Sequence, residues 1–252
     1  MDLQPPQVPA KRTHAMVACI VISIAVIALY FVPFGGYILY PFMLVYTFVH
    51  EMGHGISALL VGGQFDKFEM WVDGSGVATT ALSVSASNFA HAFVAFGGLV
   101  APAIMAAICL FLACKPKRAR IGLYLFTGIC AISILLVVRN LFGILFVALC
   151  GAVTFCLAKV PKNDAVPQYS ILFLAITLLT SVFSRGDYLF TATAETANGV
   201  MPSDVGQIAE YLILPSWFWG TLIALISVGI LILGIRAFFR VPQAPQSPKS
   251  LR

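Results

Sequence analysis

Two histidines and a glutamate stand at a spacing that suits a metal ion. The segment His50-Glu51-Met52-Gly53-His54 fits the pattern H-E-x-x-H. On a helix, positions i and i+4 share a face, so both imidazoles can reach one zinc ion. Glu51 lies beside them and can take a proton from a zinc-bound water, whose pKa zinc lowers to about 7. It can then pass that proton to a leaving amine. The motif predicts zinc-dependent hydrolysis of peptide bonds.

The composition places this motif in a membrane protein. Of the 252 residues, 60% are hydrophobic and 10% are charged, against roughly 45–50% and 25% in ordinary soluble domains. A soluble protein of this size could not cover so much apolar surface with so few charges, so we expect a lipid bilayer around it. We interpret the formal net charge of +5 as loop and tail charge facing anionic lipid. No nucleic-acid-binding motif accompanies it, so no nucleic-acid partner is expected.

Chance is the alternative explanation of the motif, and its surroundings argue against it. Ionisable residues inside an apolar span are expensive in lipid and are functional by default. His50, Glu51 and His54 lie in the middle of such a span. The cysteines carry no comparable signal because none forms a C-x-x-C pair, and we interpret them as helix-packing residues. They are Cys19, Cys109, Cys114, Cys130, Cys150 and Cys156.

The elements that must position the motif are apolar helices and one hairpin. Seven apolar segments are predicted, at about 15–32, 40–61, 89–113, 121–138, 141–158, 171–183 and 216–235. Several are long enough to cross roughly 30 Å of hydrocarbon. After the histidine segment, residues 65–72 alternate apolar and polar and are followed by Asp73-Gly74-Ser75-Gly76, which predicts a β-hairpin within about 64–87. The fold class expected is an all-α polytopic membrane protein of about six or seven transmembrane helices with a small β-hairpin insertion.

One multi-span domain is expected over residues 15–236, between disordered tails at 1–14 and 237–252. The 115–120 loop, the 159–164 loop and the C-terminal tail hold ten of the fifteen Lys and Arg residues, which favours a cytoplasmic position for all three. Seven spans would then leave Lys11 and Arg12 outside, so either the first segment does not cross fully or the number of spans is six. The compact size and the missing transit peptide favour a bacterial inner (plasma) membrane.

The sequence also resembles a known family. The segment YTFVHEMGHGISALLVGG at 46–63 is similar to the zinc helix of the site-2 protease family of intramembrane metalloproteases, closest to its bacterial branch. Further matching segments are the hairpin, FGGLVAPA at 96–103, VRNLFG at 138–143 and residues 203–227. The resemblance implies a Zn²⁺-dependent endopeptidase that cleaves membrane-spanning or membrane-adjacent proteins or peptides.

The third zinc ligand departs from the family pattern. The resemblance implies an aspartate from an Asn-Pro-x-x-x-x-Asp-Gly-like or Leu-Asp-Gly motif on a later span, but the only Asp-Gly here is Asp73-Gly74 in the hairpin turn. Zinc still needs a third protein ligand if water holds the fourth position. We choose Asp187, at the end of the sixth apolar segment; the alternative is an ordinary loop carboxylate near Arg185.

Two other residues compete with Asp187 for this role. Asp204 precedes a helical pattern, and a helix N-cap explains it more simply than metal ligation does. His91 begins the third apolar segment, where a lone histidine is more often interfacial or hydrogen-bonded than a ligand. The expected site is therefore His50, His54 and Asp187 as ligands with Glu51 as the catalytic base.

Two features could serve the substrate. Asn140 could hydrogen-bond the substrate backbone or the zinc helix; the alternative is a tight turn beside a snorkelling Arg139. A transmembrane substrate hides its own carbonyls and must be unwound to be cut. The strand at 65–72 could hold it extended by strand addition, or could simply connect two spans.

Two other functions remain open on the sequence alone. An ion- or proton-translocating protein would carry ionisable residues along several spans and internal repeats, and neither is found here. A non-catalytic scaffold of the same family is the second alternative. Such a scaffold need not keep the general base, so the presence of Glu51 argues against it.

Overall fold

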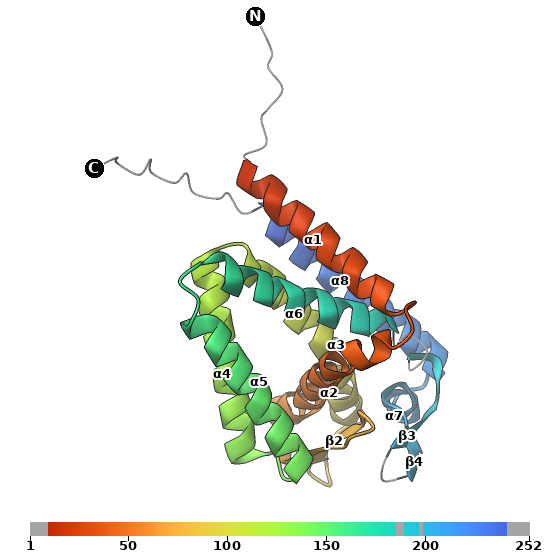
Figure 1. Cartoon of the computed structure of the whole chain (residues 1–252). Helices are drawn as coiled ribbons and strands as arrows, with labels where there is room; N and C mark the ends of the chain where they lie inside the picture. The colour runs from red at the N-terminus through yellow and green to blue at the C-terminus, as the bar shows by residue number, and fades with distance from the viewer. Residues whose placement is uncertain (1–9, 185–188, 197–198, 241–252) are drawn as a thin grey trace, which may run out of the picture.

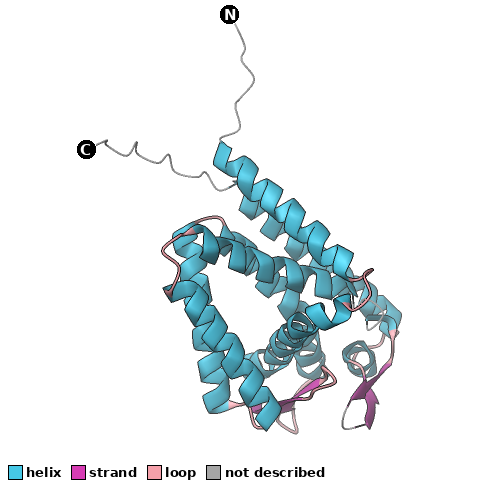
Figure 2. Ribbon diagram, in the orientation of Figure 1, coloured by secondary structure: helices cyan, strands magenta, loops and turns pink. Residues whose placement is uncertain are grey.

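The protein is a bundle of helices with two small hairpins (Figures 1 and 2). The computed structural model describes residues 10–184, 189–196 and 199–240. The helices are α1 (Ala10–Leu29), α2 (Gly35–Leu60), α3 (Asn88–Ala113), α4 (Pro116–Leu136), α5 (Leu141–Lys159), α6 (Ala165–Ser184), α7 (Asp204–Tyr211) and α8 (Ser216–Arg240). The strands are β1 (Gln64–Met70), β2 (Gly76–Ala81), β3 (Thr193–Thr196) and β4 (Gly199–Pro202). This confirms the predicted helical fold with a hairpin after the histidine helix.

Five of the described helices are long and apolar enough to cross a membrane: α3, α4, α5, α8 and most of α6. A shorter apolar stretch, Val17–Leu29, lies in α1. Helix α2 has 26 residues but is not among the five. Its centre carries two histidines and a glutamate, which lower its mean hydropathy. Its polar centre is covered by protein instead, since His50 and Glu51 are both buried.

Helix α3 is the central packing partner of α2. A Cβ atom at Gly53 of α2 would lie 2.5 Å from both the Gly97 oxygen and the Ala101 Cβ of α3. A Cβ at Gly97 would in turn meet Ser57 Oγ at 1.8 Å. Small residues on both helices therefore let the two backbones approach closely, as at many membrane helix contacts. This approach fixes α3 directly against the turn of α2 that carries His54.

The first hairpin is held on both sides. Strand β1 pairs antiparallel with β2, with Phe68 opposite Ala78. On its other side, the Phe68 N–H donates to the Val137 oxygen at 2.7 Å and the Arg139 N–H donates to the Phe68 oxygen at 3.0 Å. The prediction that strand 65–72 offers a free edge to a substrate is therefore wrong, because residues 137–139 occupy that edge. The edge that remains belongs to β2.

Asn140 adds side-chain hydrogen bonds to the same edge of β1. Its side-chain oxygen accepts from the Met70 N–H and from the Gly143 N–H, both at 3.2 Å, and its amide nitrogen donates to the Met70 oxygen. It is the N-cap of α5 as well as a backbone partner of β1. Asn140 thus lies in the short connection between α4 and α5, and its side chain bonds the Met70 backbone of the hairpin instead of the substrate or the zinc helix.

No element is predicted between the sixth and seventh apolar segments, yet this stretch contains regular structure. Strands β3 and β4 form a second hairpin, with Thr193 opposite Pro202, and α7 follows almost immediately. Helix α7 packs on α3 and α8 through Val205 and Ile208, which are fully or almost fully buried. This unpredicted element brings the start of α7 to the histidines.

Candidate metal centre

His50 and His54 lie one helical turn apart in α2, on the same face. Their Nε2 atoms are 3.1 Å apart, and their rings cross at 87° with centroids 4.7 Å apart. His50 is 8% exposed, and His54 is partly buried. The i, i+4 spacing therefore produces the convergence expected from the sequence, with two imidazole nitrogens facing one point.

Helix α3 fixes the ring of His54. Its Nδ1 lies 2.9 Å from the Val94 oxygen, and because a carbonyl can only accept, Nδ1 carries the proton and donates it. Nε2 is then the nitrogen that is turned toward His50. Gly98 makes room for the ring, since a Cβ there would lie 2.2 Å from its Cε1 and Nε2 atoms. Such a donor–carbonyl contact sets the tautomer of metal-ligating histidines.

Asp204 reaches both histidines from the far end of the chain. Its carboxylate oxygens lie 3.1 Å from His50 Nε2 and 3.3 Å from His54 Nε2, and the residue is 5% exposed. Asp204 is the first residue of α7, and the N-cap is Ser203, whose hydroxyl accepts from the Gly206 N–H at 3.1 Å. The capping role predicted for Asp204 therefore belongs to Ser203, and the Asp204 carboxylate is turned to the histidines instead.

Ser203 also ties the start of α7 to the chain before it. It is fully buried, its N–H donates to the Ala192 oxygen at 2.9 Å, and its hydroxyl donates to the Thr191 oxygen at 2.5 Å. A short helix would otherwise fray at this end. The two bonds to residues 191–192 hold Asp204 at a defined position beside α2.

The three donor groups fit a zinc ion by distance. Ligand atoms at about 2.0–2.1 Å from a tetrahedral zinc lie roughly 3.3 Å from one another. The separations here are 3.1 Å between the two Nε2 atoms, and 3.1 and 3.3 Å from these atoms to the carboxylate oxygens. Two imidazoles and one carboxylate are also a common zinc ligand set that leaves the fourth position open.

The charges of the cluster favour a cation held between its three groups. Burial would by itself raise the pKa of the Asp204 carboxyl, but the charge and hydrogen bonds of His54 and His50 outweigh it and hold this pKa well below its usual range. The carboxylate is therefore ionised, and it faces two nitrogens that approach each other closely. A divalent cation between the three groups would balance this arrangement.

Glu51 stands next to the histidines and is oriented by the hairpin. Its Oε2 accepts from the Ala78 N–H of β2 at 2.7 Å, and the residue is 7% exposed. One ligand atom from each of His50, Glu51 and His54 lies within 4.8 Å of the others. Strand β2 comes close here because Gly76 has no side chain; a Cβ there would lie 3.1 Å from Glu51 Cγ.

The remaining predicted ligands are placed as follows. Asp187 lies outside the described residues, so its role stays a prediction. His91 stacks on Tyr211 of α7, with ring centroids 4.6 Å apart and planes at 16°. This stacking holds the far end of α7 against α3.

The distribution of buried ionisable residues also bears on ion translocation. Over the described parts of the chain, the buried Asp, Glu, His, Lys and Arg residues are His50, Glu51 and Asp204. All three belong to the one cluster. A pathway across the membrane would require such residues at several depths, so this arrangement favours a local chemical site.

Comparison with known protein families gives an independent result. Residues 17–234 match the family described as Peptidase M50B-like. The match covers most of the chain and includes every helix that contributes to the metal centre. Comparisons with curated proteins and with solved structures gave no match. The chain therefore belongs to the Peptidase M50B-like family, the site-2 protease family of membrane-embedded metallopeptidases.

Proposed function

We propose that this protein is a zinc-dependent endopeptidase that cuts its substrates within or next to the membrane. His50, His54 and Asp204 hold the zinc ion, and Glu51 is the general base. The observation that carries the proposal is the approach of the Asp204 carboxylate to both Nε2 atoms, at 3.1 and 3.3 Å, beside a buried Glu51. The bacterial inner (plasma) membrane stays the predicted location.

Zinc at this position would supply Lewis acidity and a lowered pKa for water. Glu51 performs the proton transfers. Its carboxylate takes the proton of the attacking water as the new C–O bond forms, and it gives that proton to the amine nitrogen as the C–N bond breaks. The Ala78 N–H bonded to Oε2 keeps the carboxylate beside the histidines during both transfers. Burial of Glu51 and Asp204 limits competing water.

The edge of β2 is the proposed support for the substrate. Phe68 directs its N–H and C=O to residues 137–139, so Ala78 opposite it directs its own groups away from β1. Met70 likewise bonds Asn140, which leaves the groups of its partner Gly76 on the outer side. The Ala78 N–H already bonds Glu51. An unwound substrate segment that adds to this edge would lie directly beside the catalytic base.

Zinc stoichiometry tests the ligand set. We would measure zinc in detergent-purified wild type and in His54→Ala, Asp204→Ala and Asp187→Ala. About one zinc per chain is expected in the wild type and in Asp187→Ala, with a large loss in the other two. Loss of zinc in Asp187→Ala with retention in Asp204→Ala would transfer the third-ligand role to Asp187. A wild type that takes up no zinc under metal-replete conditions would favour the non-catalytic scaffold.

A further inference from the structure

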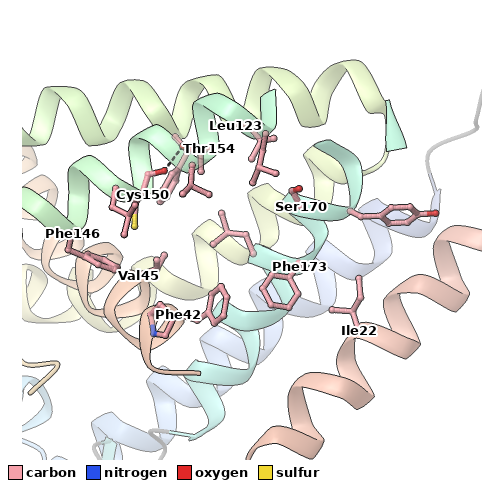
Figure 3. A pocket seen from close by; sticks show the side chains of 16 residues that line it. Ile22, Phe42, Val45, Leu123, Phe146, Cys150, Thr154, Ser170 and Phe173 are labelled. Atoms are coloured by element: carbon pink, nitrogen blue, oxygen red, sulfur yellow. Dashed lines mark hydrogen bonds between the residues drawn. The ribbon is translucent and has the colours of Figure 1, made fainter. Parts of the chain in front are cut away.

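A large cavity lies between the helices, apart from the metal centre. Its volume is about 590 Å³, within the range of ligand pockets, which is about 300–1,000 Å³. Segments of α1, α2, α4, α5 and α6 line it (Figure 3). Phe42 and Val45 of α2, Cys150 and Thr154 of α5 and Phe173 of α6 point toward the same space.

The cavity offers almost nothing to a polar ligand. Its two aliphatic hydroxyls are bonded within their own helices: Thr154 Oγ1 donates to the Cys150 oxygen and Ser170 Oγ to the Val166 oxygen, both at 2.8 Å. Most other lining side chains are aliphatic or aromatic. Cavities of this kind exclude water. In a protein surrounded by lipid, the occupant is therefore apolar.

The dimensions of the cavity suit a single hydrocarbon chain. On α5 the lining runs from Phe146 to Leu157, a length of about 16 Å at 1.5 Å per residue. Dividing the volume by that length gives a mean cross-section on the order of 40 Å². A flexible hydrocarbon chain fits a space of this length and cross-section.

One end of the cavity lies beside the basic loops. Leu157 and Tyr169, which line it, lie within a few residues of the α5–α6 loop, and Tyr169 is 42% exposed. Arg120 at the start of α4 bonds the same loop through the Pro161 oxygen and Asp164. The loops at 115–120 and 159–164 contain six Lys and Arg residues and one acid, Asp164. An anionic headgroup is complementary to this end.

We propose that the cavity binds one acyl chain of an anionic phospholipid, whose headgroup lies against the loops at 115–120 and 159–164. The bound chain fills the space beside the first half of α2. There, Phe42 packs edge-on against Phe173 with ring centroids 4.9 Å apart, and Val45 lies five residues before His50. The lipid thus supports the helix that carries the histidines. This binding site does not depend on the proposed peptidase activity.

Native mass spectrometry of the full-length protein tests the proposal, with phosphatidylglycerol and phosphatidylcholine as the probe lipids. The cavity is filled in Ser170→Phe and Val153→Trp. The matched controls are Thr221→Phe, whose hydroxyl also bonds its own helix, at 2.8 Å, and Leu145→Trp, which is 60% exposed on α5. Neither control residue lines the cavity. Circular dichroism and a single elution peak establish that each variant is folded.

Wild type and controls are expected to retain one phosphatidylglycerol, and the filled variants to bind it at least tenfold more weakly. Lys159→Gln combined with Lys162→Gln should reduce the preference for phosphatidylglycerol over phosphatidylcholine while leaving the cavity intact. Wild-type affinity in both filled variants would overturn the acyl-chain site. Equal wild-type affinity for the two lipids would overturn the anionic headgroup.

Discussion

At the scale of a single residue, replacing Glu51 distinguishes proton transfer from zinc binding. In the wild type, the Ala78 nitrogen lies 2.7 Å from Glu51 Oε2. The side-chain oxygen of Glu51→Gln can still accept this hydrogen bond, but the amide cannot take a proton. We expect zinc content to stay at the wild-type level while peptide cleavage falls by about 10²–10⁴-fold. Cleavage of a membrane-protein substrate in liposomes, measured beside zinc content, checks this. Loss of zinc together with activity would instead make Glu51 a ligand.

Gly98 tests how tightly α3 holds the His54 ring. In Gly98→Ala the new Cβ would lie 2.2 Å from the ring, so the imidazole must move. Because the Val94 contact orients that ring, we expect zinc affinity to fall by about 10–100-fold, as for other losses of ligand support. Gly128→Ala on α4 is the matched control, since nothing lies within 4 Å of its added Cβ. Competition with a fluorescent zinc chelator gives both affinities; equal values would show that the ring adapts.

The histidines and Asp204 differ in how far the sequence can predict them. His50, Glu51 and His54 belong to one helical turn, so their spacing alone predicts that they converge. Asp204 meets them only through tertiary packing of a short helix that follows a hairpin with strands of four residues each. Asp204 directly follows Ser203 at the start of a helical pattern, and the pattern does not show which of the two is the N-cap. No local pattern distinguishes them, because the partner of the carboxylate is distant in the chain.

At the scale of elements, β2 is where the hairpin and the base meet. Ala78→Pro removes the N–H that bonds Glu51 and stiffens the edge proposed for the substrate. The β1–β2 pairing is kept because this N–H points away from β1, while the proline ring displaces the Glu51 carboxylate that now accepts from it. We expect zinc content to be unchanged and cleavage to be lost. Ala78→Ser, which keeps the N–H, should retain activity; equal activity in both variants would exclude the β2 edge from catalysis.

Asn140 joins two elements, and its removal should cost stability. Asn140→Ala loses an N-cap and two bonds to the Met70 backbone, which together contribute roughly 2–3 kcal/mol. Asn163→Ala is the control, because its side chain accepts only from the Ala165 N–H in an exposed turn, and it should cost about 1 kcal/mol or less. Thermal unfolding in detergent compares the two. A similar Tm for both variants would mean that the hairpin is held without Asn140.

Apolar periodicity predicted the long helices well, because each must satisfy its own backbone in lipid. It failed between the sixth and seventh segments, where β3, β4 and α7 are short and mixed in polarity. It also assigned the free edge to the wrong strand of the hairpin. The alternation in 65–72 describes β1 alone and holds no information on residues 137–140, which cover that strand.

At the scale of the whole molecule, the metal centre connects segments that are far apart in the chain. Helix α2 supplies two ligands and α7 a third, while α3 lies between the two helices and contacts both. The β3–β4 hairpin and α8 flank α7, so the position of the segment from β3 to α8 depends partly on this link. Metal binding should therefore stabilise the fold as a whole as well as the site.

Zinc-dependent unfolding checks this connection. A ligand that binds only the folded state adds about 2.7 kcal/mol to the free energy of unfolding at 100 times its Kd. We expect zinc to raise the Tm of the wild type above that of the chelated protein, and to raise that of Glu51→Gln by a similar amount, since both keep the three ligands. Asp204→Ala should show little increase, because α7 is then no longer joined to α2 through the metal. A full increase in Asp204→Ala would mean that the histidines bind zinc without α7, and that the segment from β3 to α8 is positioned by apolar packing alone.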